Sequence, residues 1–281
     1  MTPLLGILLA LLLLTGDDTT GASWIGRYDL GEKHPRAHRL PKKLREASGL
    51  ALTAGGRLVT HNDELGVVYE LDPADGRVLG SISLGRFTPE EDFEGIAAKQ
   101  DTLFLVTSNG NIFRFRMAPL GSRVAFTVLK TPLTSANNVE GLEYDPETDC
   151  LLLACKGRAG ISREEQEKWK QYRAVYAFSL AEGRLLPEPR FLIPVDEAGG
   201  RFNPSGIARH PLAGTFFVLA AEGSRLLELS PRGTLLGVAE IRAKENPNPE
   251  GICFLADGTL VLVNDAATDQ SMTFYPPLPG E

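Results

Sequence analysis

Five oxygen-bearing side chains, each directly followed by a glycine, recur along this 281-residue chain. They are, in order, Ser48, Glu94, Glu140, Ser205 and Glu250. The glycines that follow them are 46, 46, 65 and 45 residues apart, which indicates a repeat. If the repeats surround one axis, three carboxylates and two hydroxyls meet at one point. Such oxygen atoms are the ligands that Ca²⁺ prefers, so the pattern predicts a central calcium site formed by these five residues.

The carboxylates of this pattern need a counter-ion. Three carboxylates held close together repel one another and take up protons unless a cation lies between them. Ca²⁺ accepts about six to eight oxygen ligands in flexible geometry, so five side chains and bound water would satisfy it. The alternative is that the five residues are ordinary turn residues, whose carboxylates form hydrogen bonds with the backbone amides of neighbouring blades.

The elements that position these residues follow from the same repeat. A period of about 45 residues is typical of a β-propeller blade. In each repeat a short apolar strand follows the glycine, and then come a turn, a second and more apolar strand, and a third strand. The first four repeats continue into a fourth strand, and four antiparallel strands make one blade. We expect an all-β, five-bladed propeller in a single domain, residues 23–281, with blades starting near residues 48, 94, 140, 205 and 250.

The fifth repeat ends after its third strand, so its fourth strand has to come from elsewhere. Residues 24–30, near the N-terminus, have the length and character of a strand. Pairing them with the fifth repeat would close the ring and remove an exposed sheet edge. We therefore expect an N-terminal strand at residues 24–30 to complete the fifth blade.

The long third interval contains an insertion, because 65 residues are too few for two blades. Residues 157–171 include Ser162 and Glu165, which have the spacing of a helix capping box. We expect one short helix that ends near Gln171 and forms a wall of the face carrying the calcium site. Trp169 would offer an apolar surface to that face.

A second set of polar side chains follows the second strand of each repeat. Because the second strand returns to the face that the first strand leaves, these side chains should surround the calcium site. They are Asn62, Asp63, Ser108, Asn109, Lys156, Glu222, Asn264 and Asp265. Asp63 and Asp265 are candidates for a general base, and Lys156 is the one cation of the set, able to hold an anionic group. The alternative is that these residues only end their strands, since strand ends are commonly polar.

The charge distribution bounds the partners of the protein. The formal net charge of -7 argues against nucleic-acid binding, because nucleic-acid-binding proteins carry a basic surface. We expect the acidic residues 89–93 and the basic residues 33–45 to form solvated loops on the calcium-bearing face. The sequence contains no Gly-x-Ser-x-Gly motif, no Walker loop and no zinc-type spacing of Cys and His. Cys150, Cys155 and Cys253 are expected as buried free thiols.

The N-terminus carries a leucine-rich run, residues 4–14, that is too short to span a membrane as a helix. The run suits the apolar core of a secretory signal peptide, although no Lys or Arg precedes it, and an uncleaved N-terminal anchor is the alternative. We expect residues 1–22 to direct export to the periplasm or cell envelope. The mature protein would be a monomer, which the N-terminal segment or peripheral contacts could attach to the membrane.

Several motifs resemble those of a known family. They include Asp63-Glu64 with Gly66 and Tyr69-Glu70-Leu71-Asp72-Pro73, Asp92-Phe93-Glu94-Gly95-Ile96-Ala97, and Asn203-Pro204-Ser205-Gly206-Ile207-Ala208. Over nearly the whole chain after the leader, the sequence resembles the SdiA-regulated family of bacterial exported β-propellers. The resemblance implies a cell-envelope propeller with a metal site, and it implies no particular reaction. Glu-Gly-Ile-Ala patterns also occur in phytase-like esterase propellers.

The order Ser, Glu, Glu, Ser, Glu is also similar to the central calcium site of the five-bladed calcium-activated nucleotidases. This similarity implies that the ring residues are calcium ligands: Ser48, Glu94, Glu140, Ser205 and Glu250. The basic and aromatic side chains with which those enzymes bind nucleotides have no clear counterpart in this sequence.

Two classes of function compete on these observations. We expect a binding or scaffold protein of the cell envelope, with Ca²⁺ on the axis and an unknown small molecule or envelope protein as partner on that face. The alternative is a calcium-dependent hydrolase of phosphoesters or nucleotides, in which the metal orients the phosphoryl group. Asp63 or Asp265 would then act as base, and Lys156 would stabilise the anion. Lactonase propellers use similar metal sites, but they typically have six blades and ligand sets rich in Asn and Asp.

Overall fold

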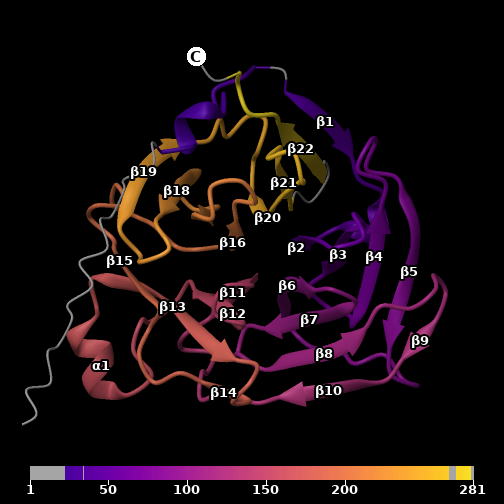
Figure 1. Cartoon of the computed structure of the whole chain (residues 1–281), viewed down its shortest axis with the longest axis horizontal. Helices are drawn as coiled ribbons and strands as arrows, with labels where there is room; N and C mark the ends of the chain where they lie inside the picture. The colour runs from indigo at the N-terminus through magenta and orange to yellow at the C-terminus, as the bar shows by residue number, and fades with distance from the viewer. Residues whose placement is uncertain (1–22, 34, 266–269, 280–281) are drawn as a thin grey trace, which may run out of the picture.

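The computed structural model describes residues 23–33, 35–265 and 270–279, and its strands form five sheets arranged around a central axis (Figure 1). The expected leader, residues 1–22, lies outside the described residues. Each sheet is one blade, and its innermost strand contacts the innermost strands of the two neighbouring blades. The predicted five-bladed β-propeller is therefore confirmed.

The strands of the first four blades follow one another from the axis outward. Blade one consists of β2 (Ala47–Leu52), β3 (Leu58–Asn62), β4 (Val67–Leu71) and β5 (Val78–Leu84), and the short β9 (Arg123–Val124) pairs in parallel with β5. Blade two consists of β6 (Phe93–Lys99), β7 (Thr102–Thr107), β8 (Ile112–Arg116) and β10 (Phe126–Leu129). Blade three consists of β11 (Val139–Asp145), β12 (Cys150–Cys155) and β13 (Tyr172–Ser179), with β14 (Arg184–Leu185) and β15 (Phe191–Pro194) both paired to β13. Blade four consists of β16 (Gly206–Arg209), β17 (Phe216–Ala220), β18 (Arg225–Leu229) and β19 (Leu235–Glu240).

An N-terminal strand completes blade five, but it does not lie at the predicted residues. The blade consists of β20 (Pro249–Phe254), β21 (Leu260–Asn264), β22 (Ser271–Tyr275) and β1 (Arg36–Arg39). The predicted closure of the ring is confirmed, whereas the prediction of a strand at residues 24–30 is wrong. The closing strand comes instead from residues 33–45, which were expected as a solvated loop, and the 3-10 helix η2 (Lys42–Leu44) then leads into blade one.

Residues 24–30 pack against blades four and five in a different conformation. They begin with the 3-10 helix η1 (Ile25–Arg27), and the Ile25 amide donates a hydrogen bond of 2.9 Å to the Glu228 carboxylate. Ile25 and Tyr28 belong to one buried apolar cluster with side chains of both blades. Three residues apart, they share one face of a 3-10 turn, whereas in a strand they would point to opposite faces. The apolar character of the segment therefore reflects a turn that covers the seam between two blades.

The insertion in blade three forms the helix α1 (Arg163–Lys168), as predicted. Its capping box is present: the Glu165 amide donates to Ser162 Oγ at 3.2 Å, and the Ser162 amide donates to the Glu165 carboxylate at 2.8 Å. Trp169 follows the helix, but it is only 7% exposed because it packs into the apolar cluster that joins blades two and three. The expectation of an accessible apolar surface at Trp169 is therefore wrong, and this residue anchors the helix to the core.

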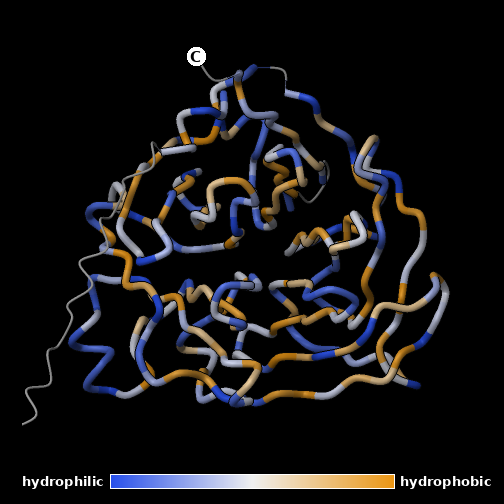
Figure 2. The backbone as a smooth tube through the Cα atoms, in the orientation of Figure 1, coloured by the Kyte–Doolittle hydropathy of each residue, from blue (hydrophilic) through white to orange (hydrophobic). Residues whose placement is uncertain are grey.

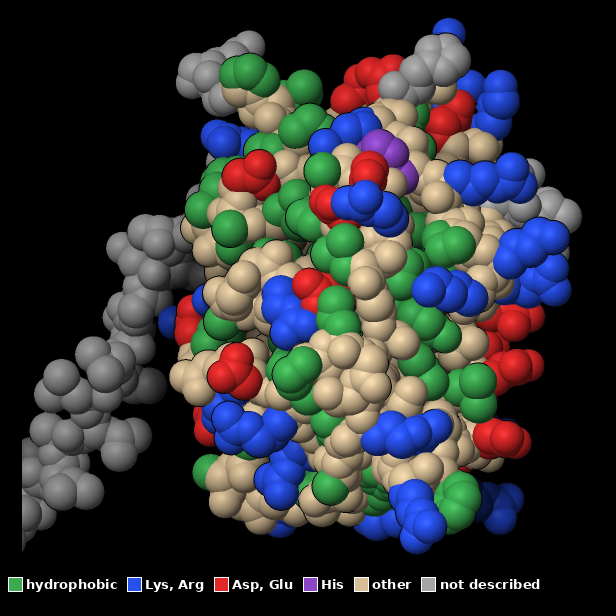
Figure 3. Space-filling model, turned by 90° about the vertical axis from the view of Figure 1, so that its right-hand side faces the viewer, with side chains coloured by type: hydrophobic (Ala, Val, Ile, Leu, Met, Phe, Trp, Pro, Cys, Tyr) green, Lys and Arg blue, Asp and Glu red, His purple; other side chains and the backbone are tan. Residues whose placement is uncertain are grey.

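Five clusters of buried apolar side chains hold neighbouring blades together. Hydrophobic segments accordingly recur in every blade around the ring (Figure 2). Cys150, Cys155 and Cys253 are buried and free, as predicted. On the side of the molecule near β5 and β9, cationic and acidic side chains are interspersed with hydrophobic ones (Figure 3). Within the described ranges, no helix is both long and apolar enough to cross a bilayer.

Candidate functional site

We call the five residues of the predicted calcium site the axial ring, or the ring: Ser48, Glu94, Glu140, Ser205 and Glu250. Four of them are extra residues in the innermost strands of their blades. In blade two the pairing with β7 jumps from Phe93 to Gly95, so Glu94 has no partner in the neighbouring strand. Blade four differs slightly, because Ser205 directly precedes β16. The same one-residue shift as in blade two leaves out Ser48 in β2, Glu140 in β11 and Glu250 in β20. Such β-bulges change the direction of a side chain and are common next to functional sites.

The glycine after each of these residues lets neighbouring blades touch at the axis. A Cβ atom on Gly95 would lie 2.8 Å from the Leu142 amide nitrogen, and a Cβ atom on Gly206 would lie 3.0 Å from the Glu250 carbonyl oxygen. A side chain at either position would push two blades apart. The glycines therefore allow the close backbone approach that the repeat requires, and they keep the ring residues within reach of one another.

The three glutamates of the ring lie close enough to interact electrostatically. Burial raises the pKa of Glu94, and the carboxylates of Glu140, Asp92 and Glu250 raise this pKa further. Burial, followed by the charge of Glu140, raises the pKa of Glu250 to about 7. Burial also raises the pKa of Glu140, which is 5% exposed. The structure thus brings together the three predicted carboxylates, although they come from three different blades.

Lys156 is the cation next to this cluster, and it pairs with a glutamate. Its Nζ lies 3.2 Å from Glu140 Oε1, and Asn138 Nδ2 donates a hydrogen bond of 2.7 Å to the same oxygen. The ammonium group lowers the pKa of all three ring glutamates, Glu94, Glu140 and Glu250. The end of β12 therefore supplies part of the positive charge that the ring needs.

The other two glutamates have fewer partners. Asn248 Nδ2 donates a hydrogen bond of 3.0 Å to Glu250 Oε1. In the described part of the chain, no side chain or amide donates a hydrogen bond to the Glu94 carboxyl group, and no cation forms an ion pair with it. Because Lys156 supplies one positive charge against three carboxylates that are buried or half-buried, the cluster favours the uptake of protons or of a further cation.

The two serines of the ring use their hydroxyl protons on the backbone. Ser48 Oγ donates to the Glu46 carbonyl oxygen at 3.0 Å, and Ser205 Oγ donates to the Pro249 carbonyl oxygen at 3.0 Å. Ser205 also accepts a hydrogen bond of 3.1 Å from the Ala221 amide. Ser205 thus joins blade four to blade five through a hydrogen bond to the backbone.

The residue types of the ring fit a hard cation, although the side chains do not enclose one in this arrangement. Among residues 23–33, 35–265 and 270–279, no three His, Cys, Asp or Glu side chains form a ready metal-binding group. The axial cavity, lined among others by Ser48, Glu140 and Glu250, has a volume of about 10 Å³, which is the scale of one water molecule. Carboxylates of raised pKa beside such a cavity can bind a cation in exchange for protons.

The three catalytic candidates lie on the same face as the ring. Burial, together with the charges of Glu46 and Asp265, raises the pKa of Asp63 to about 6. Asp63 Oδ1 is buried and has no hydrogen-bond partner among the described residues. Asp265 also raises the pKa of Glu250, so it lies near both Asp63 and the ring. Lys156 and Asp265 therefore lie beside the carboxylate cluster, and Asp63 lies next to Asp265.

Other members of the second polar set serve the fold. Asn264 is completely buried, and its Nδ2 donates hydrogen bonds of 3.2 Å to Asn246 and to Thr273. It therefore does not face the ring, and the expectation that it does is wrong. Glu222 accepts a hydrogen bond from Asn203 of the same blade. Asn264 and Glu222 therefore form hydrogen bonds within their own blades, in agreement with the alternative that these polar residues only end their strands.

Residues two positions before the ring residues also belong to the site, although they were not predicted from the sequence. Asp92, Asn138 and Asn248 contact or influence the ring glutamates that follow them. Every ring residue has such an oxygen-bearing residue two positions earlier: Glu46, Asp92, Asn138, Asn203 and Asn248. This recurrence is the signal that could have identified them.

The predicted acidic loop lies beside the ring. A cavity of about 680 Å³, which we call the acidic groove, is lined by Asp63, Glu64, Leu65, Glu90, Glu91 and Asp92. A β-bridge between Leu65 and Glu90 joins its two sides. Because Asp92 also raises the pKa of Glu94, the negative charge of the groove continues into the ring.

Comparisons with known proteins bear on the fold. No family model matches the chain, and no curated protein matches it. Among solved structures, the glutaminyl cyclase of Myxococcus xanthus is 14% identical over 88% of this chain and 96% of its own, with a TM-score of 0.57. A glucose dehydrogenase is 14% identical over 88% of this chain and 100% of its own, with a TM-score of 0.56. A luciferin-regenerating enzyme is 10% identical over 87% of this chain and 96% of its own, with a TM-score of 0.54.

At these identities the likenesses show the fold alone. The chain is a β-propeller whose neighbours among solved structures include enzymes, and the reactions of those enzymes belong to them.

Proposed function

We propose that this chain is an exported cell-envelope protein of the SdiA-regulated kind, which binds Ca²⁺ on the propeller axis. The proposed ligands are the ring residues Ser48, Glu94, Glu140, Ser205 and Glu250. The observation that carries the proposal is a cluster of three mutually interacting carboxylates from three blades, one buried and two half-buried, beside a single ammonium charge from Lys156. A divalent cation would balance this charge and would lower the pKa of each carboxyl group.

A cation on the axis would also act on the whole fold. The ring residues lie in or directly before the innermost strands, which contact one another around the axis. Ca²⁺ bound among them would hold the blades together, so calcium would stabilise the folded state. Free coordination positions on the open side of the ring could then bind a small molecule or an envelope protein. In this function the propeller is a binding or scaffold protein.

A second function, hydrolysis of phosphoesters or nucleotides with Ca²⁺, is favoured by Asp63. Its carboxyl group has a pKa of about 6 and a buried, unpartnered Oδ1, which suits a general base near neutral pH. Asp265 lies nearby, and Lys156 could stabilise an anionic group after leaving Glu140. Calcium would supply Lewis-acid stabilisation of the phosphoryl group.

The test is a calcium titration of the full chain after treatment with EGTA. A one-site calcium complex should raise the melting temperature by roughly 5–10 °C at a calcium concentration about a hundred times the Kd. Glu94→Gln should abolish most of this rise, because it removes the least compensated carboxyl group. Glu240→Gln, on the exposed outer strand β19, is the matched control and should leave the rise unchanged.

The same samples distinguish the two functions. A calcium-dependent turnover of p-nitrophenyl phosphate or nucleotides that is lost in Asp63→Asn would support the hydrolase. Calcium binding without turnover would support the binding protein. Absence of a calcium effect on melting, or an equal effect in wild type and Glu94→Gln, would refute the axial calcium site.

A further inference from the structure

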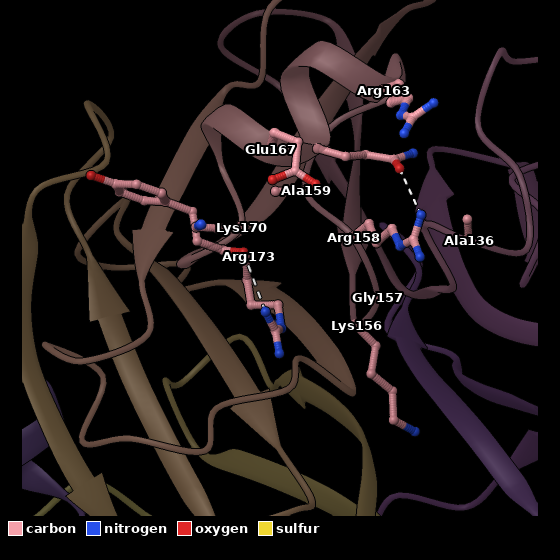
Figure 4. Close-up of a pocket in the computed structure, with 11 residues that line it drawn as sticks. Ala136, Lys156, Gly157, Arg158, Ala159, Arg163, Glu167, Lys170 and Arg173 are labelled. Atoms are coloured by element: carbon pink, nitrogen blue, oxygen red, sulfur yellow. Dashed lines mark hydrogen bonds between the residues drawn. The ribbon is translucent and has the colours of Figure 1, made fainter.

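A cavity of about 750 Å³ lies between helix α1 and the outer part of blade three, and its charge is opposite to that of the ring. We call it the basic pocket. Its charged lining consists of Lys156, Arg158, Arg163, Lys170 and Arg173, together with the acidic Glu167 (Figure 4). Five cations against one carboxylate form a strongly positive site in a chain whose net charge is -7.

The protein balances only part of the positive charge of the basic pocket, since Glu167 lines it and the charge of Glu222 acts on Arg173. Arg158 donates to Gln166 Oε1 at 2.8 Å, and Arg173 Nε donates to Asn203 Oδ1 at 3.0 Å, so both guanidinium groups bind neutral amides. Of the five cations, only Lys156 forms an ion pair with a carboxylate within the described residues, and that partner belongs to the ring. An external anion would supply further counter-charge.

The walls of the basic pocket are held in place. Asn137 Nδ2 donates hydrogen bonds of 3.0 Å to the carbonyl oxygens of Arg158 and Gly160, which fixes the loop before the helix. The capping box at Ser162 fixes the start of α1, and the buried Trp169 fixes its end. A site formed in advance spends less free energy on ordering when a ligand binds.

The cations lie around the basic pocket on more than one side. In Figure 4, Arg158 and Arg163 lie on one side of the pocket and Lys170 and Arg173 on the other. A phosphate group presents oxygens in several directions, and guanidinium groups can donate two hydrogen bonds to it, whereas a carboxylate presents two oxygens in one plane. The cavity is also within the range of roughly 300–1,000 Å³ that small-molecule sites occupy.

We propose that the basic pocket binds the phosphate group of a small phosphorylated molecule. Arg158, Arg163, Lys170 and Arg173 supply the donors, and Lys156 connects this site to the axial ring. The site goes beyond the proposed calcium function and does not depend on it, because none of the first four cations contacts a ring residue.

The test uses pyrophosphate as the probe and the full chain after treatment with EDTA and removal of the EDTA by gel filtration, so that a metal on the axis does not contribute. Calorimetric titration should show one site with a Kd below about 1 mM. Arg163→Gln and Lys170→Gln should each weaken this binding about tenfold, because each removes a charged donor. Both variants should keep the wild-type melting temperature.

The matched controls are Arg114→Gln and Arg116→Gln. These arginines line a cavity of similar volume, about 680 Å³, in blade two. Their substitution should change the affinity for pyrophosphate less than about twofold. No binding by the wild type, equal weakening by pocket and control variants, or equally tight binding of citrate would each overturn the assignment.

Discussion

The axial ring and the basic pocket lie next to each other, yet they arise in opposite ways. The ring takes one residue from each of five blades, and the β-bulges and glycines that position it recur with the repeat. The basic pocket comes mostly from one insertion, residues 157–171, which only blade three carries, together with Lys156 at the end of β12 and the start of strand β13. Repetition thus produces a site on the axis that belongs to the whole propeller, and the insertion adds a site that no other blade duplicates.

The two regions also respond differently to unbalanced charge. The carboxylates of the ring, which are buried or half-buried, can take up protons, and the pKa of Glu250 is accordingly raised to about 7. Arginine cannot release its proton near neutral pH, so the basic pocket keeps its charge under all ordinary conditions. The ring can therefore exchange protons for a cation, whereas the basic pocket can be neutralised only by an anion.

The largest expected effect tests the architecture of the ring. In Gly95→Ala the new Cβ atom would lie 2.8 Å from the Leu142 amide nitrogen, so the backbones of blades two and three would have to separate. We expect a loss of about 3 kcal/mol in the free energy of unfolding, measured by urea denaturation. Arg163→Gln in the basic pocket should cost less than about 0.5 kcal/mol.

Gly26→Ala is the control for this prediction, because a Cβ atom there would have no neighbour within 4 Å. A Gly95→Ala variant as stable as Gly26→Ala would mean that the innermost strands can move apart freely. The ring would then lack the rigid geometry described above.

The next largest effect is a difference between the two sites in how ligand binding depends on pH. In the metal-free protein Glu250 has a pKa of about 7 instead of its ordinary 4.5, so between these values the folded state holds a proton that the unfolded chain has released. The contribution of Glu250 to the free energy of unfolding is fully present below about pH 4.5 and is lost as the pH rises through about 7. Because Ca²⁺ would stabilise the ionised carboxylates, the rise in melting temperature that calcium causes should be larger at about pH 8 than at about pH 5.

The basic pocket provides the contrast for this measurement. Sulfate does not titrate in this range and arginine keeps its charge, so the affinity for sulfate should be nearly equal at about pH 5 and about pH 8. A calcium effect that does not change with pH would contradict the exchange of protons at the ring. A strong pH dependence of sulfate binding would contradict the arginine-based pocket.

The smallest effect concerns the helix that carries part of the basic pocket. Ser162→Ala removes the capping box of α1 and should destabilise the protein by about 1 kcal/mol. Since Arg163 and Lys170 depend on the position of this helix, the affinity for pyrophosphate should fall about two- to threefold. The affinity for calcium, measured on the same variant, should not change. A parallel loss of both affinities would show that the two sites are not independent.

Features that the blades repeat could be predicted from the sequence. The Ser/Glu-Gly pairs gave the number of blades and the position of every innermost strand. The closing strand was misplaced for a physical reason: Arg36–Arg39 lies at the outer edge of blade five and is mostly exposed, so it carries no apolar pattern. Residues 24–30 are apolar because they cover a seam between blades, which resembles a strand when only composition is considered.

The site was predictable to the same extent. Glu94, Glu140 and Glu250 converge because the repeat places them, but the Lys156–Glu140 ion pair depends on how strands β11 and β12 align at their ends. The basic pocket could not be predicted, since its cations resemble the solvated charges of any surface helix in sequence. Only the course of the insertion brings Arg158 and Arg173 to one cavity.

Calorimetric titration of calcium into the EGTA-treated full chain, at about pH 7 in two buffers of different ionisation enthalpy, tests the axial calcium site most directly. The carboxylates of the ring have raised pKa values, so binding should occur at one site and should release protons to the buffer. The observed enthalpy should therefore differ between the buffers, and Glu94→Gln should reduce that difference. Binding with no dependence on the buffer, or no binding at all, would contradict a calcium site at the ring.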